Sequence, residues 1–279
     1  MRIRVALGVF AALAVIVAFG TYVALRTGAP HVTIPRPGRA CTVQADGQVS
    51  LDGTQMANAA TIAAVGITRG LPERAMVVAL ATALQESKLE NLAGGDRDSV
   101  GLFQQRPSQG WGTEAQIRDP RYSSGRFYNA LIRVKGWQEM RVTEAAQRVQ
   151  RSAYPEAYQR WADEAEVLTK ALLGHATGAV ACAFPGQPAV QGAAATAALT
   201  ELLRLDWGAV PISATQGLTL TVRDTRHGWQ YAHWLVAHAN EQGVRSVRYD
   251  SLVWTAKGGT WTKATADASS QVVAEIYPG

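Results

Sequence analysis

A single glutamate stands near the end of the most apolar helical stretch of the chain. The run AMVVALATALQESKL begins at Ala75 and places Glu86 about one turn before its end. The side chains one and two turns earlier, Ala83, Thr82 and Ala79, are small, so we expect them to leave a groove floor beside the carboxyl group. A glutamic acid in such a position is suited to general acid catalysis. The alternative from position alone is a solvated glutamate at a frayed helix end.

The loop after this helix is rich in side chains that can bind a polar ligand. A polar turn, GGDRDS at 94–99, leads into VGLFQQRPS at 100–108. Its apolar Leu102 and Phe103 are expected to anchor the loop in the core. Glutamine and serine side chains offer donors and acceptors to sugar hydroxyl and acetamido groups, and an indole offers a flat face for a sugar ring. The candidate ligand-binding residues are Ser99, Gln104, Gln105 and Trp111.

The order of these motifs resembles the lytic transglycosylase and goose-type lysozyme superfamily over about residues 50–170. Glu86-Ser87 matches its Glu-Ser motif, and Gly101-Leu102-Phe103-Gln104 matches its Gly-Leu-Met-Gln motif with Phe in place of Met. Ala153-Tyr154 is similar to the start of its Ala-Tyr-Asn-Ala-Gly motif, but Pro155 replaces Asn and no Gly follows. The stretch from Gln85 to Gly112 is also similar to an actinobacterial cell-wall branch of the superfamily.

This resemblance implies an enzyme that cleaves peptidoglycan glycan strands between N-acetylmuramic acid and N-acetylglucosamine, with Glu86 as the catalytic acid and with no cofactor. A transglycosylase needs one acid, because the 6-hydroxyl of the substrate closes on C1. A hydrolase needs a second carboxylate to activate water, roughly 6.5–9.5 Å away for inversion. Asp98 is the candidate for that carboxylate, with Asp96 beside it in the same turn, and the alternative is that both are solvated turn residues. Transglycosylation is the favoured reaction.

Two further expectations concern the same site. Tyr154 is expected to bind substrate or to hydrogen-bond Glu86, with core packing as the alternative. A non-catalytic peptidoglycan-binding or scaffold protein of the cell envelope is the alternative to an enzyme, and an intact Glu86 favours the enzyme.

Metal and nucleic-acid sites are not expected. The five histidines are His31, His175, His227, His233 and His238. No two of them have the spacing of three or four that places ligands on adjacent helical turns. The formal net charge of +5 is mild, and no Lys/Arg-rich block is present, so nucleic acid is not a favoured partner. Cys41 and Cys182 are expected to form a disulfide in an oxidising compartment, with two unpaired thiols as the alternative.

The elements that must position this site fall into five expected segments. Val5 to Leu25 is an uncharged apolar run long enough to cross a bilayer. We expect a single-pass membrane anchor with the remainder outside the cytoplasm; a cleaved signal peptide is the alternative. The segments are the anchor at 5–25, a tether at 26–50, a catalytic domain at 51–170, a linker at 171–195 and an accessory domain at 196–279. The expected fold class is a mainly α lysozyme-like domain with a small α+β C-terminal domain behind the transmembrane helix. The oligomeric state is left open.

The accessory segment resembles a degenerate D-Ala-D-Ala carboxypeptidase-like module. The residues that carry this resemblance are Gly228 to Ala237, Gly243 to Asp250 and Val253-Trp254. Such enzymes hold a metal with a His, a later Asp and a His-x-His, and this sequence has no His-x-His. The resemblance therefore implies a wall-binding or spacing role and no metal.

Overall fold

The computed structural model describes residues 40–279, except 215–216 and 266–268. The described residues belong to one compact unit. The expected membrane anchor at 5–25 and most of the expected tether lie outside the described residues. Within the part that is described, no helix combines the length and the apolar character needed to span a membrane.

Helix α3 (Glu73–Ser87) is the central helix of the first part of the chain, as its apolar sequence predicts. Every residue from Ala75 to Leu84 is buried, because α3 packs against four other helices. These neighbours are α2 (Gly53–Thr68), α5 (Pro120–Leu131), α6 (Val142–Gln150) and α7 (Ala162–Leu172). The packing fixes the direction of α3, and so the place where Glu86 emerges at its last turn.

A three-stranded antiparallel sheet joins two distant parts of the chain. Its order is β2-β1-β3, with β1 at Cys41–Gln44, β2 at Gln48–Leu51 and β3 at Val180–Cys182. Cys41 and Cys182 face each other across β1 and β3 and form a disulfide. The predicted disulfide is confirmed. Strands β1 and β2 begin within the segment expected to be a tether, 26–50, and β3 lies within the segment expected to be a linker, 171–195. Both segments therefore contain buried strand residues.

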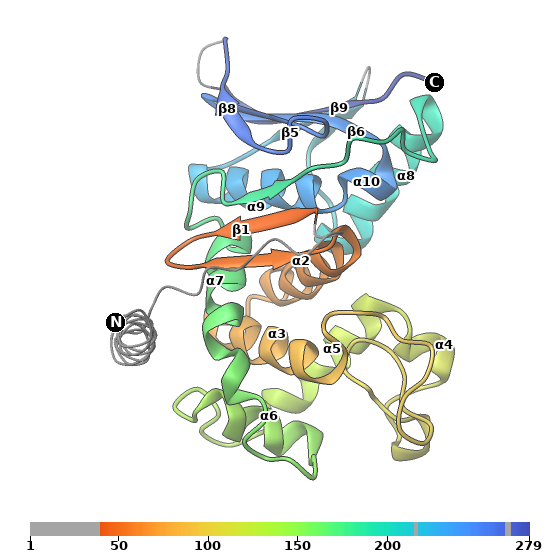
Figure 1. The fold of residues 1–279 in the computed structure, drawn as a ribbon, viewed down its shortest axis with the longest axis vertical. Helices are drawn as coiled ribbons and strands as arrows, with labels where there is room; N and C mark the ends of the chain where they lie inside the picture. The colour runs from red at the N-terminus through yellow and green to blue at the C-terminus, as the bar shows by residue number, and fades with distance from the viewer. Residues whose placement is uncertain (1–39, 215–216, 266–268) are drawn as a thin grey trace, which may run out of the picture. The chain divides into compact units, whose positions relative to one another are not determined.

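The C-terminal part is a six-stranded antiparallel sheet with helices on one face (Figure 1). The strand order is β4-β5-β9-β6-β7-β8. The strands are β4 (Ile212–Ala214), β5 (Leu218–Thr221), β6 (Val244–Asp250), β7 (Leu252–Thr255), β8 (Trp261–Lys263) and β9 (Ser269–Ile276). Helix α9 (Thr225–Ala237) packs on β6 and β9, where Val247 and Ala274 are fully buried. Helices α8 (Gly192–Trp207) and α10 (Ala239–Gln242) flank it.

The remaining helical elements are short. They are α4 (Glu114–Ile117) and the 3-10 turns η1 (Pro107–Gln109) and η2 (Gln159–Trp161). Both turns follow Glu86 in sequence, and η2 leads directly into α7.

The expected fold class is wrong. The described residues form a mixed α/β fold with 45% helix and two antiparallel sheets, in place of a mainly α domain followed by a small α+β domain. The observed fold differs from the expected one because β1, β2 and β3, each of three or four residues, form a sheet in the first part of the chain. Val43 pairs with Val180, far away in sequence, and such pairing leaves no local periodicity to detect. Whether 51–170 and 196–279 fold as separate domains stays a prediction.

Candidate active site

The Glu86 carboxyl group is held by two neutral hydrogen-bond donors. The Tyr158 hydroxyl donates to Oε1 over 2.6 Å, and the Gln150 amide donates to the same oxygen over 3.0 Å. Gln150 also donates to the Phe103 carbonyl over 2.8 Å, which links α6 to the loop after α3. Burial and the neighbouring Glu86 charge raise the pKa of Tyr158 well above its usual value, so this hydroxyl remains a donor.

The second carboxyl oxygen of Glu86 remains available. Among the described residues, Oε2 has no hydrogen-bond partner and Glu86 forms no ion pair, while the side chain is half-buried. A carboxyl group anchored through one oxygen by neutral donors keeps the other oxygen free to carry and transfer a proton. This arrangement differs from that of a solvated glutamate at a frayed helix end.

The expected groove floor beside Glu86 is wrong. Ala79, Thr82 and Ala83 are fully buried, and the Thr82 hydroxyl donates back to the carbonyl of Val78 over 2.7 Å. They belong to the core because helices surround α3 on all sides at this level. Only the last turn of the helix emerges, so the surroundings of Glu86 come from η2, α6 and the following loop.

Tyr154 is not the hydrogen-bond partner of Glu86. Its side chain is 75% exposed, and Tyr158 occupies the position that was assigned to it. The sequence AYPEAY contains two Ala-Tyr pairs, and the second one carries the buried tyrosine. Pro155, which departs from the family pattern after the first pair, is the signal that could have pointed to Tyr158. A substrate-binding role for Tyr154 stays a prediction.

Asp98 serves the loop and does not contact Glu86. Its carboxylate accepts from Arg106 Nε over 2.7 Å, and from the Ser108 N–H and hydroxyl over 2.8 and 3.0 Å. The Arg106 guanidinium and the Ser108 donors hold the pKa of Asp98 well below its usual range. A carboxylate so strongly stabilised in its charged form is a weak base, and this geometry favours a bracing role over activation of water.

The motif Glu-Ser is joined to the motif Gly-Leu-Phe-Gln by a direct contact. The Ser87 hydroxyl donates to the Leu102 carbonyl over 2.8 Å, and Leu102 and Phe103 are fully buried, as the sequence predicts. Gly101 has a φ of 77°, and a Cβ there would lie 2.8 Å from the Ile117 carbonyl oxygen. Glycine is therefore required where the loop turns beneath Glu86.

The predicted ligand-binding side chains of this loop mostly bond within it. Ser99 is buried and donates to the Asp96 carbonyl over 2.7 Å. Gln104 donates to Gly101 over 3.2 Å, and the buried Gln105 donates to the carbonyl of Ser123, also over 3.2 Å. Trp111 is half-buried and packs against the core. The structure therefore brings Ser99, Gln104 and Gln105 together as loop supports, and their substrate-binding role stays a prediction.

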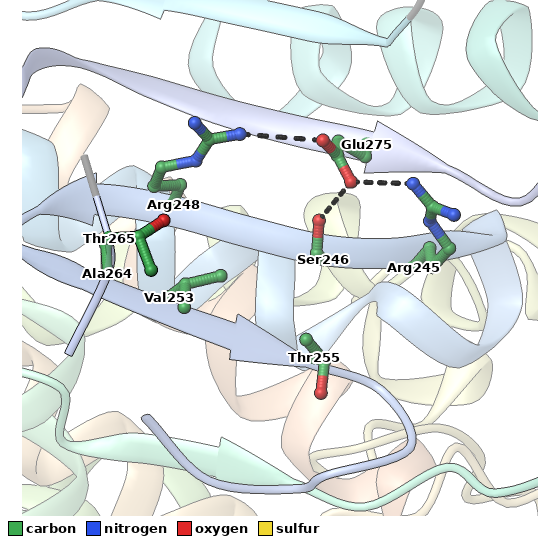
Figure 2. Close-up of a pocket in the computed structure, with 8 residues that line it drawn as sticks. All are labelled: Arg245, Ser246, Arg248, Val253, Thr255, Ala264, Thr265 and Glu275. Atoms are coloured by element: carbon green, nitrogen blue, oxygen red, sulfur yellow. Dashed lines mark hydrogen bonds and ion pairs between the residues drawn. The ribbon is translucent and has the colours of Figure 1, made fainter. Parts of the chain in front are cut away.

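A surface hollow of about 450 Å³ lies elsewhere, on the six-stranded sheet. Figure 2 shows Arg245, Ser246 and Arg248 around the Glu275 carboxylate. Ser246 and Arg245 each donate to Glu275 over 2.8 Å, and they hold the pKa of Glu275 below its usual value. The other carboxyl oxygen of Glu275 accepts from Arg248 over 3.5 Å. Because both oxygens have cationic or hydroxyl partners, Glu275 is less suited than Glu86 to transfer a proton.

A His–Asp pair that the sequence was not expected to form lies at the start of α9, in addition to the longer contact of 3.8 Å between His238 and Asp206. Asp224 accepts from the backbone N–H of His227 as the N-cap of α9, and its other oxygen lies 2.7 Å from Nδ1 of the same histidine. No cluster of three or more His, Cys, Asp or Glu side chains suited to a metal ion occurs in the described part of the chain. The pair is thus a helix cap.

Comparison with protein-family models and with curated proteins finds no match to this chain.

Proposed function

We propose that this chain cleaves the glycan strands of peptidoglycan, with Glu86 as the proton donor to the glycosidic oxygen. The observation that carries this proposal is the difference between the two oxygens of the Glu86 carboxyl group. Oε1 accepts from Tyr158 and Gln150, and Oε2 has no partner among the described residues. The resemblance of the Glu-Ser and Gly-Leu-Phe-Gln motifs to lytic transglycosylases and goose-type lysozymes supplies the substrate class.

Transglycosylation is the reaction that we favour. It requires one acid, because the 6-hydroxyl of the muramic acid residue attacks C1 and forms a 1,6-anhydro end. Hydrolysis needs a second carboxylate, and the bonds that Arg106 and Ser108 make to both oxygens of Asp98 support transglycosylation over hydrolysis. Membrane anchoring, with the domains on the extracytoplasmic side, stays a prediction.

Glu86→Gln tests the proposal, with Glu90→Gln as the matched control. Glu90 lies one turn further along the chain and is exposed. Glutamine at 86 preserves the shape of the side chain and removes the transferable proton, so release of soluble glycan fragments should fall by roughly 10²–10⁴-fold. Glu90→Gln should retain cleavage, and both variants should melt as the parent does. Cleavage at the parental rate by Glu86→Gln contradicts the role of Glu86.

A further inference from the structure

Two positively charged side chains share one indole ring beside Glu86. The Nζ atom of Lys88 lies 4.2 Å from the centre of the Trp161 ring, and the Arg160 guanidinium carbon lies 5.1 Å from it. Lys88 is the left-handed C-cap of α3, with a φ of 58°, and its Nζ also donates to the Leu84 carbonyl over 3.1 Å. The turn that ends the catalytic helix therefore brings the lysine back towards η2.

The indole itself is fixed at the same end of α3. Its Nε1 donates to Oε1 of Gln85, the neighbour of Glu86, over 2.8 Å. Trp161 belongs to η2, which directly follows Tyr158, the donor to Glu86. One short segment thus supplies a hydrogen bond to the acid and the platform for the two cations.

The charges of this cluster are not balanced locally. In the described part of the chain, neither Lys88 nor Arg160 takes part in an ion pair. Burial and the Arg160 charge lower the pKa of Lys88, and Glu86 opposes this effect. Two like charges against one indole ring repel each other, and an anion bound between them relieves this repulsion. Perturbed groups of this kind are concentrated at functional sites.

We propose that Lys88 and Arg160 form a subsite for a carboxylate carried by the glycan that Glu86 cleaves. An ammonium and a guanidinium together offer charge-assisted hydrogen bonds to both oxygens of one carboxylate. The subsite selects sugars that bear an acidic substituent over neutral sugars of equal length. The identity of the ligand rests on the proposed function. Lys88 and Arg160 are the two residues that determine specificity.

The test is binding to the full chain carrying Glu86→Gln, so that no ligand is consumed. The probes are a tetrasaccharide of alternating N-acetylglucosamine and N-acetylmuramic acid with free carboxylates, and neutral chitotetraose. We expect the acidic glycan to bind roughly 10-fold more tightly at low salt, and this preference should shrink as salt screens the charges. Lys88→Gln and Arg160→Gln should each weaken acidic binding roughly 3- to 5-fold, with neutral binding unchanged.

Two control variants separate this subsite from general effects of charge. Arg148→Gln removes an exposed cation of α6 and should leave both affinities unchanged, while Lys88→Arg keeps the charge and should retain the preference. Equal binding of the two glycans, or no binding of either, overturns the subsite. Cleavage by the parent without any preference for acidic glycan refutes the subsite alone. A preference for acidic glycan in a chain that cleaves neither substrate refutes the proposed function and retains the subsite.

Discussion

At the scale of single residues, two carboxyl groups of the same region have opposite surroundings. Glu86 has neutral donors on one oxygen, whereas Asp98 has a guanidinium and two serine donors. The first environment leaves a proton site open, and the second fixes a negative charge. The roles that we propose, acid for Glu86 and support of the loop for Asp98, rest on these different partners, because the two side chains carry the same carboxyl group.

Tyr158→Phe tests the contribution of the hydrogen bond from the Tyr158 hydroxyl to Glu86. The ring is 1% exposed, and phenylalanine preserves its packing while removing the hydroxyl donor. Hydrogen bonds to charged groups contribute roughly 1.5–3 kcal/mol, so kcat should fall by roughly 10- to 100-fold with a modest change in KM. Steady-state kinetics on soluble glycan would measure kcat and KM separately. Tyr154→Phe is the control, because Tyr154 is exposed. Parental kcat in Tyr158→Phe would show that the hydrogen bond does not position the acid.

At the scale of elements, a buried histidine joins α9 to the first part of the chain. His233 is fully buried, accepts from the N–H of Ala179 over 2.9 Å, and its Nδ1 lies 2.8 Å from the carbonyl of Ala171. Desolvation lowers its pKa from 6.5 to about 4. The folded protein therefore holds this ring neutral in a pH range where the unfolded chain would bind a proton.

The pH dependence of stability follows from this difference. Above pH 6.5 the ring is neutral in both states. Between pH 6.5 and about 4 only the unfolded state gains the proton, so the free energy of unfolding falls as pH falls, by up to roughly 3 kcal/mol from this group. His233→Gln can keep both hydrogen bonds without titrating and should flatten the slope. Denaturant unfolding at several pH values measures it, and identical slopes in parent and variant would contradict the assignment.

The elements that were predictable from sequence are those whose pattern is local. The apolar run around Ala75 to Leu84 predicts α3, and this prediction is confirmed. Strands β1 and β3 were missed because they gain their stability from each other across the chain. The candidate site likewise contains residues that a local pattern predicts and residues that only tertiary packing brings together. Glu86 was identified from its helix, while Tyr158 and Gln150 reach it only through tertiary packing, which no local pattern records.

At the scale of the whole molecule, a buried carboxylate connects helices from both parts of the chain. Asp206 of α8 forms an ion pair with Arg121 of α5 over 2.5 Å. It also accepts from Trp234 of α9 over 2.7 Å and from Thr61 of α2 over 3.3 Å. Burial raises the pKa of Asp206, and the Arg121 charge opposes that rise. Helix α5 also carries Tyr122, which donates to the Trp111 carbonyl over 3.2 Å, so this junction supports the loop beside the site.

Asp206→Ala should destabilise the molecule strongly. Among the described residues, the variant leaves Arg121 with only its longer ion-pair contact of 3.9 Å to Asp119, and removal of one partner from a buried ion pair costs roughly 3–5 kcal/mol. Glu201→Ala in the same helix is the control, because its exposed ion pair with Arg204 should contribute less than about 1 kcal/mol. Chemical unfolding of the three proteins measures the difference. Equal stability of the two variants would show that Asp206 does not connect these helices energetically.

The most direct test of the central claim is mass spectrometry of the products released from purified peptidoglycan by the full chain. The account predicts soluble muropeptides with 1,6-anhydromuramic acid ends, no such products from Glu86→Gln, and the same ends from Asp98→Asn. Reducing ends that disappear in Asp98→Asn would show hydrolysis and make Asp98 catalytic. Peptidoglycan that binds the parent protein and releases no fragments would contradict the account, and would leave the chain a wall-binding protein.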